Sequence, residues 1–280
     1  GNINILQLSP TVQATESNYK RAHGGKGTVY LECFLNQSGS VVLFDQLQTE
    51  QGGRFYRKRN RNMLVEIKED IDVYDNFRWV ALNEIGELLH LDNFVNMDSR
   101  SVLCCLVEKK EIDNPLHSTD AALNWITSLK IKYELNAELI GLRRVNDWIK
   151  DEYEIRHVSD SYFRINAVKV KANTREVTEW CQPMNKSTEA GLVGFLVAKV
   201  NDTLHFLTRG IVEVGNIDIL HLAPTIQCSM YAKRYQERHK CPPYIDIFLN
   251  ADGEILYDQL QSEEGGRFYH SQSRHVIIKV

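Results

Sequence analysis

The feature that most constrains this chain is an internal repeat of a twelve-residue string. Residues 45–56 read DQLQTEQGGRFY and residues 258–269 read DQLQSEEGGRFY, so ten of the twelve positions are identical. The two copies lie 213 residues apart, a period far longer than that of solenoid or propeller repeats. The flanking sequence repeats as well, because GNINILQLSPTVQ at residue 1 matches GNIDILHLAPTIQ at residue 215. We therefore expect a duplicated domain rather than an array of short units.

Positions that both copies of this signature keep indicate what the fold or a ligand requires. Each copy keeps a Gly-Gly pair, which predicts a turn with positive φ. The kept polar residues of the second copy are Gln261, Glu263, Arg267 and Tyr269. A Glu can act as general base, an Arg can stabilise an enolate or a phosphate, and a Tyr can protonate a leaving hydroxyl. A buried polar network that anchors a hairpin explains the same residues, so both interpretations stay open.

Composition excludes several classes of protein. The chain has 280 residues, of which 43% are hydrophobic and 25% charged, and this is ordinary for one large or two modest globular domains. A net charge of −4 argues against a general binder of nucleic acid or anionic membrane. No apolar run reaches the roughly 18 residues of a spanning helix, and the first residues do not resemble a signal peptide. We expect a soluble, cytoplasmic chain with no nucleic-acid or membrane partner.

The metal and cofactor motifs that we looked for are missing. The six cysteines show no CxxC spacing and are expected to be reduced thiols in the core. HExxH, GxxxxGK[ST], GxGxxG and GxSxG do not occur. The sequence therefore predicts no metal site and no bound cofactor.

Apolar periodicity and turn residues predict an α+β fold with mixed, mostly antiparallel sheets. Helices are expected at 83–90, 120–133 and 138–150, the second with a cap at residues 118–120. Strands are expected at YLECFLN (30–36), its counterpart YIDIFLN (244–250), 162–170, 176–181, 191–200 and 203–214. Two units result, residues 1–115 and residues 116–280. Because Gly1 falls in the middle of a unit, we expect the sequence to be part of a longer chain.

Residues outside the second signature add candidates for a site. Trp180 can stack on a nucleobase or pack in the core, and His205 in LHFL can be a base or a structural histidine. His221 stands where the first copy has Gln7, which permits a role in only one of two sites. Substrate contacts are further expected from Gln13, Gln227, Tyr231, Arg54, Arg57, Arg59, Arg61 and Arg274, the counterpart of Arg61. The basic run after the first signature is either a solvated loop or a diphosphate contact.

Several strings together resemble the NDP-hexose 2,3-dehydratase family. They are QLSPTVQAT, DQLQTEQGGRFYRKRNRNMLVEI, NFVNMDSRSVLCCL, EWCQP, LAPTIQC and QSEEGGRFYH, and they cover most of the chain. The resemblance implies tandem Nudix-like α/β/α units, with 1–115 the C-terminal part of the first and 116–280 the second, lacking its C-terminal helix. It also implies homodimers and a dTDP-4-keto-6-deoxyhexose substrate. Chains of this family begin with a half-unit that is absent here.

The chemistry that the resemblance implies is loss of the C2 hydroxyl from a 4-keto sugar. The C4 ketone acidifies the proton on C3, so a base can form an enolate that expels the hydroxyl without a redox cofactor. We expect Glu263 or His205 to be the base and Tyr269 the acid. Arg267 and Arg274 are expected to hold the enolate or the diphosphate.

Two other functions stay open at this point. In the first, the chain is a non-catalytic module that binds nucleotide sugars and dimerises. In the second, it is a Nudix pyrophosphohydrolase, but residues 175–179 (REVTE) match only part of the Nudix box REUxEExGU, so we do not infer metal-dependent hydrolysis. Differences between the copies, such as Asn62 against His275, favour catalysis at the second copy.

Overall fold

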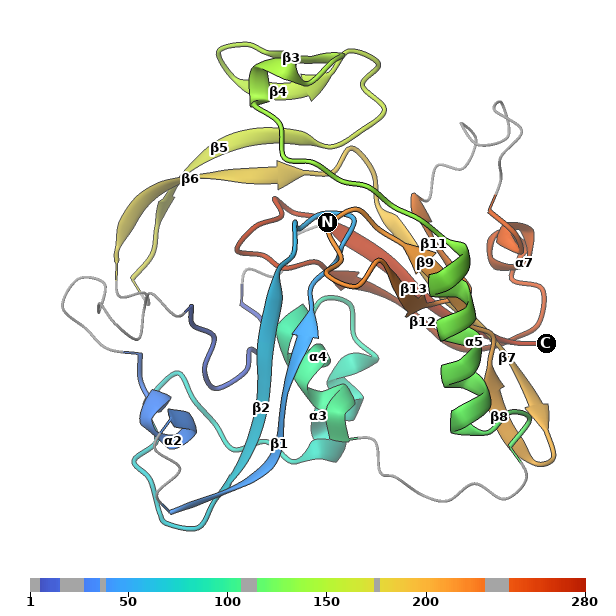
Figure 1. The fold of residues 1–280 in the computed structure, drawn as a ribbon. Coiled ribbons are helices and arrows are strands. Elements are labelled where there is room, and N and C mark those ends of the chain that lie inside the picture. Colours follow the sequence, from blue (N-terminus) through green and yellow to red (C-terminus); the bar gives the residue numbers. More distant parts are fainter. Residues whose placement is uncertain (1–5, 16–27, 36–38, 107–114, 174–176, 230–241) are drawn as a thin grey trace.

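The computed structural model describes residues 6–15, 28–35, 39–106, 115–173, 177–229 and 242–280 (Figure 1). This part of the chain has an α+β fold with mixed and antiparallel sheets, which confirms the predicted class. Within it, no helix is long and apolar enough to cross a lipid bilayer.

The first unit consists of one long hairpin and short helices. Strands β1 (Ser40–Thr49) and β2 (Arg59–Ile67) pair antiparallel and form a separate two-stranded sheet. The helices are α2 (Leu31–Leu35), α3 (Leu82–Leu89), α4 (Met97–Leu103) and the 3₁₀ helix η2 (Cys104–Leu106). Helix α4 packs against β2, and it also reaches the second unit, as described below.

The second unit contains an antiparallel meander that extends away from the rest of the chain (Figure 1). Its strands, in spatial and sequence order, are β3 (Trp148–Lys150), β4 (Glu154–His157), β5 (Arg164–Lys171) and β6 (Glu179–Lys186). The long curved ribbon of β5 and β6 carries the small β3–β4 hairpin at its end (Figure 1). Pro183 lies within β6, which is an edge strand and so tolerates a residue without an amide proton.

A five-stranded mixed sheet forms the centre of the second unit. Its members are β7 (Gly191–Val200), β8 (Thr203–Phe206), β11 (Ile226–Ser229), β12 (Glu254–Ser262) and β13 (Gln272–Lys279). The order is β11-β7-β13-β12, with β8 paired to β7, and only the β7–β13 pair is parallel. The remaining elements are α5 (Thr119–Lys132), the 3₁₀ helix η3 (Leu142–Arg144), β9 (Arg209–Val212), β10 (Leu220–Ala223) and α7 (Ile245–Asn250).

The backbone repeats with the sequence. The β1–β2 and β12–β13 hairpins share a register, since Asp45 pairs with Met63 as Asp258 pairs with Val276. Each hairpin has an irregularity just before that aspartate, between Val42 and Phe44 in β1 and between Ile255 and Tyr257 in β12. Positive φ angles also recur at matching residues, at Tyr30 and Tyr244, at Arg57 and His270, and at Gly39 and Gly253. The duplication is therefore structural, whereas the likeness to Nudix units stays a prediction.

The segments YLECFLN and YIDIFLN are helices, and the prediction of strands there was wrong. They form α2 and α7, each preceded by a tyrosine with positive φ. In α7 the buried residues are Ile245 and Phe248, a spacing of three that suits one face of a helix. The alternation of apolar residues in so short a run fits either period, and tertiary packing decided between them.

Two further expectations need correction. The predicted helix at 138–150 is only η3 followed by β3, and Asp147 between them has a positive φ that interrupts a helix. The Gly-Gly pairs do not have positive φ. In the first copy glycine is required for close packing, because a Cβ on Gly52 would lie 1.9 Å from Asn216 Oδ1. In the second copy nothing lies within 4 Å of such a Cβ, and we have no physical account of that pair.

Other sequence predictions are confirmed. Helix α3 lies where 83–90 was predicted, and α5 begins with Ser118 as its cap, whose side chain accepts from the amide of Ala121. The strand at 191–200 is β7, and Asn201 and Asp202 both have positive φ at the turn that follows. The predicted strand 203–214 is divided into β8 and β9. The five cysteines in the described residues are free thiols, but none is fully buried, so their placement in the core was wrong.

The main hydrophobic core lies in the second unit. It consists of Leu192, Leu196, Ile226, Ile245, Phe248, Val276 and Ile278. Gly194 allows Phe248 to approach β7, because a Cβ at this position would lie 2.4 Å from the ring. The counterparts of Ile245 and Phe248 in the first unit, Leu31 and Phe34, are only half-buried. The first unit therefore depends more on contacts with the second than on a core of its own.

Those contacts are reciprocal between the copies. Gln7 Nε2 of the first copy donates to Ser262 Oγ of the second signature over 2.7 Å. The counterpart of Gln7 is His221, and its Nδ1 lies 3.1 Å from Oγ1 of Thr49, the counterpart of Ser262. The first segment of each copy thus lies against the signature of the other copy.

Candidate functional site

The two signature loops face each other around an approximate twofold relation. Phe55 and Phe268, the same residue of the two copies, meet edge to face with ring centroids 5.8 Å apart. The guanidinium of Arg54 lies 4.6 Å from the centre of the Phe268 ring, and that of Arg267 lies 5.5 Å from the centre of the Phe55 ring. Such mutual contacts are those of an interface between two copies of one surface. The signature therefore joins the units, in addition to any role in binding.

Glu263 is buried on one side of this junction. Its Oε1 accepts from Ser273 Oγ at 2.6 Å and its Oε2 accepts from Gln51 Nε2 at 2.9 Å. Arg54 Nη1 lies 3.6 Å from the same Oε2. Burial opposes ionisation, but Arg54, Ser273 and Gln51 together hold the pKa of Glu263 below its usual value. Glu263 is therefore a desolvated carboxylate at neutral pH.

The matching side of the junction has a different chemistry. There Glu50, the counterpart of Glu263, meets Glu264, the counterpart of Gln51. Lys58 Nζ lies 3.1 Å from Glu50 Oε1 and 3.9 Å from Glu264 Oε2, and Asn60 Nδ2 also donates to Glu50 Oε1. Burial, with the nearby carboxyl groups of Glu50 and Asp98, raises the pKa of Glu264. One side thus holds an amide and a carboxylate, and the other holds two carboxyl groups.

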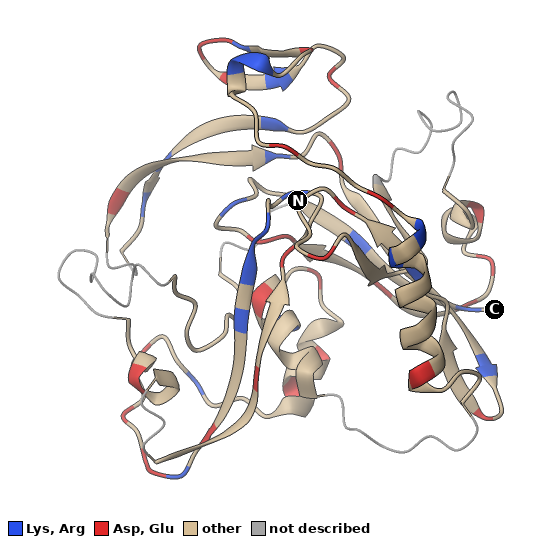
Figure 2. Ribbon diagram, in the orientation of Figure 1, with Lys and Arg blue, Asp and Glu red and all other residues tan. Residues whose placement is uncertain are grey.

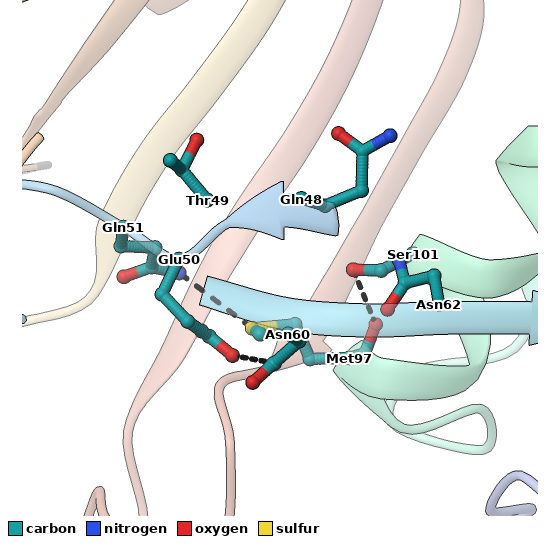
Figure 3. Close-up of a pocket in the computed structure, with 8 residues that line it drawn as sticks. All are labelled: Gln48, Thr49, Glu50, Gln51, Asn60, Asn62, Met97 and Ser101. Carbon is teal, nitrogen blue, oxygen red and sulfur yellow. Dashed lines mark hydrogen bonds between the residues drawn. The ribbon is translucent and has the colours of Figure 1, made fainter. Parts of the chain in front are cut away.

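A polar cavity of about 210 Å³ opens at this junction (Figure 3). Its lining residues are Gln48, Thr49, Glu50, Gln51, Asn60 and Asn62 of the first hairpin with Met97 and Ser101 of α4. Glu50 points toward Asn60, and Gln51 points toward the sulfur of Met97, which it approaches at 3.6 Å (Figure 3). Thr49 contacts His221, and Gln51 contacts Glu263, so groups of the second unit stand directly behind the wall. Amide, hydroxyl and carboxyl groups of this kind suit a ligand rich in hydroxyls.

Sequence reasoning did not select two charged residues beside Glu263. Arg100 of α4 donates from Nη2 to the carbonyl of Ser262 at 2.6 Å, while its buried Nη1 has no hydrogen-bond partner among the described residues. His275 of β13 also faces this cluster, and burial together with the positive charge of Arg100 lowers its pKa to about 4. The signals were the exchange of Asn62 for His275 between copies and the position of Arg100 in the resemblance string NFVNMDSRSVLCCL.

Trp180 and Tyr269 lie on the outer side of the second signature. Trp180 Nε1 donates to Gln182 Oε1 at 2.7 Å, and Gln182 Nε2 donates to the carbonyl of Gly266 at 2.8 Å. Strand β6 is also held to the signature through Asn185, whose backbone bonds to Arg267 and Tyr269. The ring of Tyr269 stacks on that of His270 at 4.3 Å, and its side chain is partly exposed. The structure therefore brings these two aromatic residues to one loop.

The two matched arginines have the same partner. Arg61 donates from Nε and Nη2 to the carboxylate of Asp45, and Arg274 makes the same pair of bonds to Asp258. Each pair ties the two strands of its hairpin. Arg274 thus has a structural partner whether or not it also meets a ligand.

The other predicted residues are dispersed. Both ring nitrogens of His205 meet backbone, since Nε2 accepts from the amide of Leu116 at 3.0 Å and Nδ1 lies 3.0 Å from the carbonyl of Thr203. Gln261 is fully buried and donates to Tyr257 and to the carbonyl of Leu89. Gln13 Nε2 lies 2.5 Å from Asp98 Oδ2, Arg59 and Gln227 are exposed, Arg57 lies over Tyr56, and Tyr231 is outside the described residues. Basic residues lie along the first part of β2, close to the signature (Figure 2).

Comparison with known proteins gives consistent matches over the whole chain. A family model described as NDP-hexose 2,3-dehydratase matches residues 1–106 and 119–280. Three curated relatives carry the name dTDP-4-dehydro-6-deoxy-alpha-D-glucopyranose 2,3-dehydratase. The protein of Saccharopolyspora spinosa is 41% identical over 100% of this chain, that of Streptomyces violaceoruber 42% over 99%, and that of Amycolatopsis orientalis 40% over 99%. The chain spans 62%, 65% and 59% of their respective lengths.

Proposed function

Because the chain belongs to the NDP-hexose 2,3-dehydratase family, we propose that it takes part in removing the C2 hydroxyl of a dTDP-4-keto-6-deoxyhexose. The observation that carries this proposal is the match of the family model to nearly all of the chain. The names of the three relatives supply the substrate class. The hydroxyl-binding character of the cavity at the junction is compatible with a hexose ring.

The proposed reaction needs a base near C3, an acid near the C2 oxygen and a group that stabilises the enolate. Glu263 is the proposed base, because it is an ionised, desolvated carboxylate held by Gln51, a residue of the cavity wall. His205 is a weaker candidate, because both of its ring nitrogens already meet backbone groups. Arg54 and Arg267, which lie on the two sides of the junction, are the guanidinium groups proposed to stabilise the enolate or the diphosphate.

The base is also subject to a constraint. Both oxygens of Glu263 accept hydrogen bonds in the free protein, so one of them must be released when substrate binds. The bond from Gln51 is the one at the cavity wall, and its amide can turn toward a sugar hydroxyl instead. We propose that substrate binding exchanges this bond and exposes Oε2 to the proton on C3.

Incubation with dTDP-4-keto-6-deoxyglucose in deuterated water tests the proposal. Elimination gives a product that tautomerises to a 3,4-dicarbonyl, which an aromatic ortho-diamine traps, and enolate formation alone exchanges the C3 hydrogen for deuterium. We expect both signals with the wild-type chain and neither with Glu263→Gln. The control is His205→Asn, which should retain both.

Other outcomes select the alternatives. Binding of dTDP with neither exchange nor elimination would favour a nucleotide-sugar-binding module, in which the signature serves only to join the units. Exchange that persists in Glu263→Gln but stops in His205→Asn would transfer the role of base to His205. The cytoplasmic, homodimeric state of the protein is part of the same proposal and is checked by sedimentation of the purified chain and fractionation of its host.

A further inference from the structure

Glu50 and Glu264 are two carboxyl groups buried beside one ammonium group. Their side chains are 3% and 9% exposed, and both face Nζ of Lys58. Glu50 Oε2 and Glu264 Oε2 each lack a hydrogen-bond partner among the described residues. A buried carboxylate oxygen without a donor is costly, so the arrangement is favourable only if a proton or a ligand supplies what is missing. Glu50 also lines the cavity, which is where such a ligand would lie.

The repeat shows that this pair is not required for folding. The same junction is built twice, once with Gln51 opposite Glu263 and once with Glu264 opposite Glu50. On the first side an amide satisfies the carboxylate directly. A glutamine at 264 would do the same for Glu50, and the chain has a carboxyl group there instead.

The charges around Glu264 favour uptake of a proton. The charged groups that face it are Lys58 at the start of the second strand of the first hairpin, Glu50 of the first signature, Asp98 of α4 and Arg267 of its own loop. These make three carboxyl groups, counting Glu264, against two cations. The pKa of Asp98 is raised as well, by burial and by the charge of Glu50. Two carboxyl groups that share one proton are a known way to keep an acid available at neutral pH.

We infer that Glu50 and Glu264 hold one proton between them and that Glu50, at the cavity wall, gives this proton to the leaving C2 hydroxyl. The inference rests on the proposed function and names its acid. As the enolate collapses, the C4 carbonyl re-forms, the C2–C3 double bond forms, and the C2–O bond breaks with its electrons on oxygen. That oxygen takes the proton and leaves as water. The proton removed from C3 by the base returns to the pair through solvent, so the cycle is balanced.

Consecutive residues thus have opposite states. Glu263 is held as a carboxylate by Arg54, Ser273 and Gln51, whereas Glu264 lies among other acids. Neighbouring carboxyl groups with pKa values displaced in opposite directions mark the base and the acid of a site. Tyr269, the acid that the sequence suggested, does not line the cavity and stacks on His270 instead. Glu50 is then the catalytic residue, and Glu264 positions the proton.

A spectroscopic experiment tests the shared proton without reference to activity. Difference infrared spectra of the wild-type chain against Glu264→Gln should show a protonated carboxyl band near neutral pH that the variant has lost. Glu264→Gln places the residue of the first copy at the equivalent position, so the fold should tolerate it. Glu254→Gln, at an exposed ion pair with Lys279, is the matched control and should leave the band unchanged. Identical carboxyl bands in the wild type and Glu264→Gln would overturn the shared proton.

The catalytic role is tested by separating exchange at C3 from loss of water. In Glu264→Gln we expect deuterium to enter C3 at a rate near that of the wild type, while elimination falls by about a hundredfold or more. Its elimination rate should also lose the alkaline limb of the pH profile, and Glu50→Gln should behave alike. Tyr269→Phe should eliminate at close to the wild-type rate. Elimination by Glu264→Gln at the wild-type rate, or its loss in Tyr269→Phe alone, would overturn the assignment. A wild-type chain that neither exchanges nor eliminates would overturn the proposed function and the catalytic role with it, while the infrared band would still report on the pair.

Discussion

Phe55 and Phe268 occupy the same position of the two repeats and meet edge to face at the junction of the two units. Phe268 is almost completely buried, and each ring also lies under the guanidinium of the opposite copy. We predict that Phe268→Ala lowers the free energy of unfolding by about 3–5 kcal/mol, because it removes a large buried side chain. A double-mutant cycle with Phe55→Ala, measured by urea denaturation, should give a coupling energy of roughly 0.5–1.5 kcal/mol. Strict additivity of the two substitutions would contradict the contact.

Gly215 joins the start of the second copy to the first signature. Its amide donates to the carbonyl of Gly52 at 2.7 Å, and its carbonyl accepts from the amide of Arg57 at 2.6 Å. A Cβ here would lie 1.7 Å from the carbonyl oxygen of Phe55, so backbone must move to admit it. Gly215→Ala should lower the free energy of unfolding by about 1–3 kcal/mol or more.

A second glycine provides the control for this prediction. Gly86 lies inside α3, and nothing is within 4 Å of a Cβ built on it. Gly86→Ala should raise the free energy of unfolding by roughly 0.5–1 kcal/mol, because alanine is the better residue within a helix. Thermal melts of both variants decide the matter, and equal effects would show that the close approach at Gly215 is not as described.

His275 should make stability depend on pH. Its pKa is about 4 in the folded chain against 6.5 for the free side chain, so between these values the unfolded chain binds a proton that the folded chain does not. The free energy of unfolding should therefore fall as the pH is lowered from 6.5 to 4, by at most about 3 kcal/mol from this residue. Above pH 6.5 the residue contributes no pH dependence.

The variant His275→Asn isolates this effect, because asparagine is the residue of the first copy at the equivalent position. Urea denaturation at several pH values should show a smaller acid loss in the variant than in the wild type. Carboxyl groups such as Glu264, whose pKa is raised, act in the opposite direction, but they are present in both proteins. Parallel pH curves for the two proteins would contradict the prediction.

The Arg274–Asp258 pair should contribute more than its counterpart, Arg61–Asp45. The side chain of Arg274 is 24% exposed and that of Arg61 is 48% exposed, so water screens the second pair more. Arg274→Lys, which removes the two-pronged geometry but keeps the charge, should lower the free energy of unfolding by about 1 kcal/mol. Arg61→Lys should have a smaller effect in the same urea titration. If Arg274 also holds a diphosphate, its variant alone will lose affinity for dTDP in a parallel calorimetric titration.

Local patterns in the sequence predict only part of this fold. Identity between the copies predicts that both signatures adopt one conformation, and the shared register of the two hairpins confirms it. The apolar periodicity was sufficient for α5 but not for α2 and α7, because a run of five or six residues fits the period of a strand and that of a helix equally well. The positive φ of Tyr30 and Tyr244, which starts both short helices, is not encoded by a residue type that favours it.

The candidate site was less predictable, because its contacts connect residues that are distant in the chain. The sequence indicated Glu263 as a kept polar residue, but nothing local showed that Gln51 and Arg54 of the other copy surround it. The difference between Gln51 and Glu264 was visible as a substitution. Its meaning depends on Glu50 across the junction, and that is a tertiary fact.

The contact of Gln7 with Ser262 spans 255 residues. A chain that emerges from the ribosome in order must expose its first segment for most of synthesis, since the surface that this segment contacts is among the last to be made. Contacts of such high sequence separation slow folding and prolong the exposure of unpaired groups. The duplicated halves consequently cannot mature one after the other, and chaperone dependence during translation should be greater than for two domains that follow each other in series.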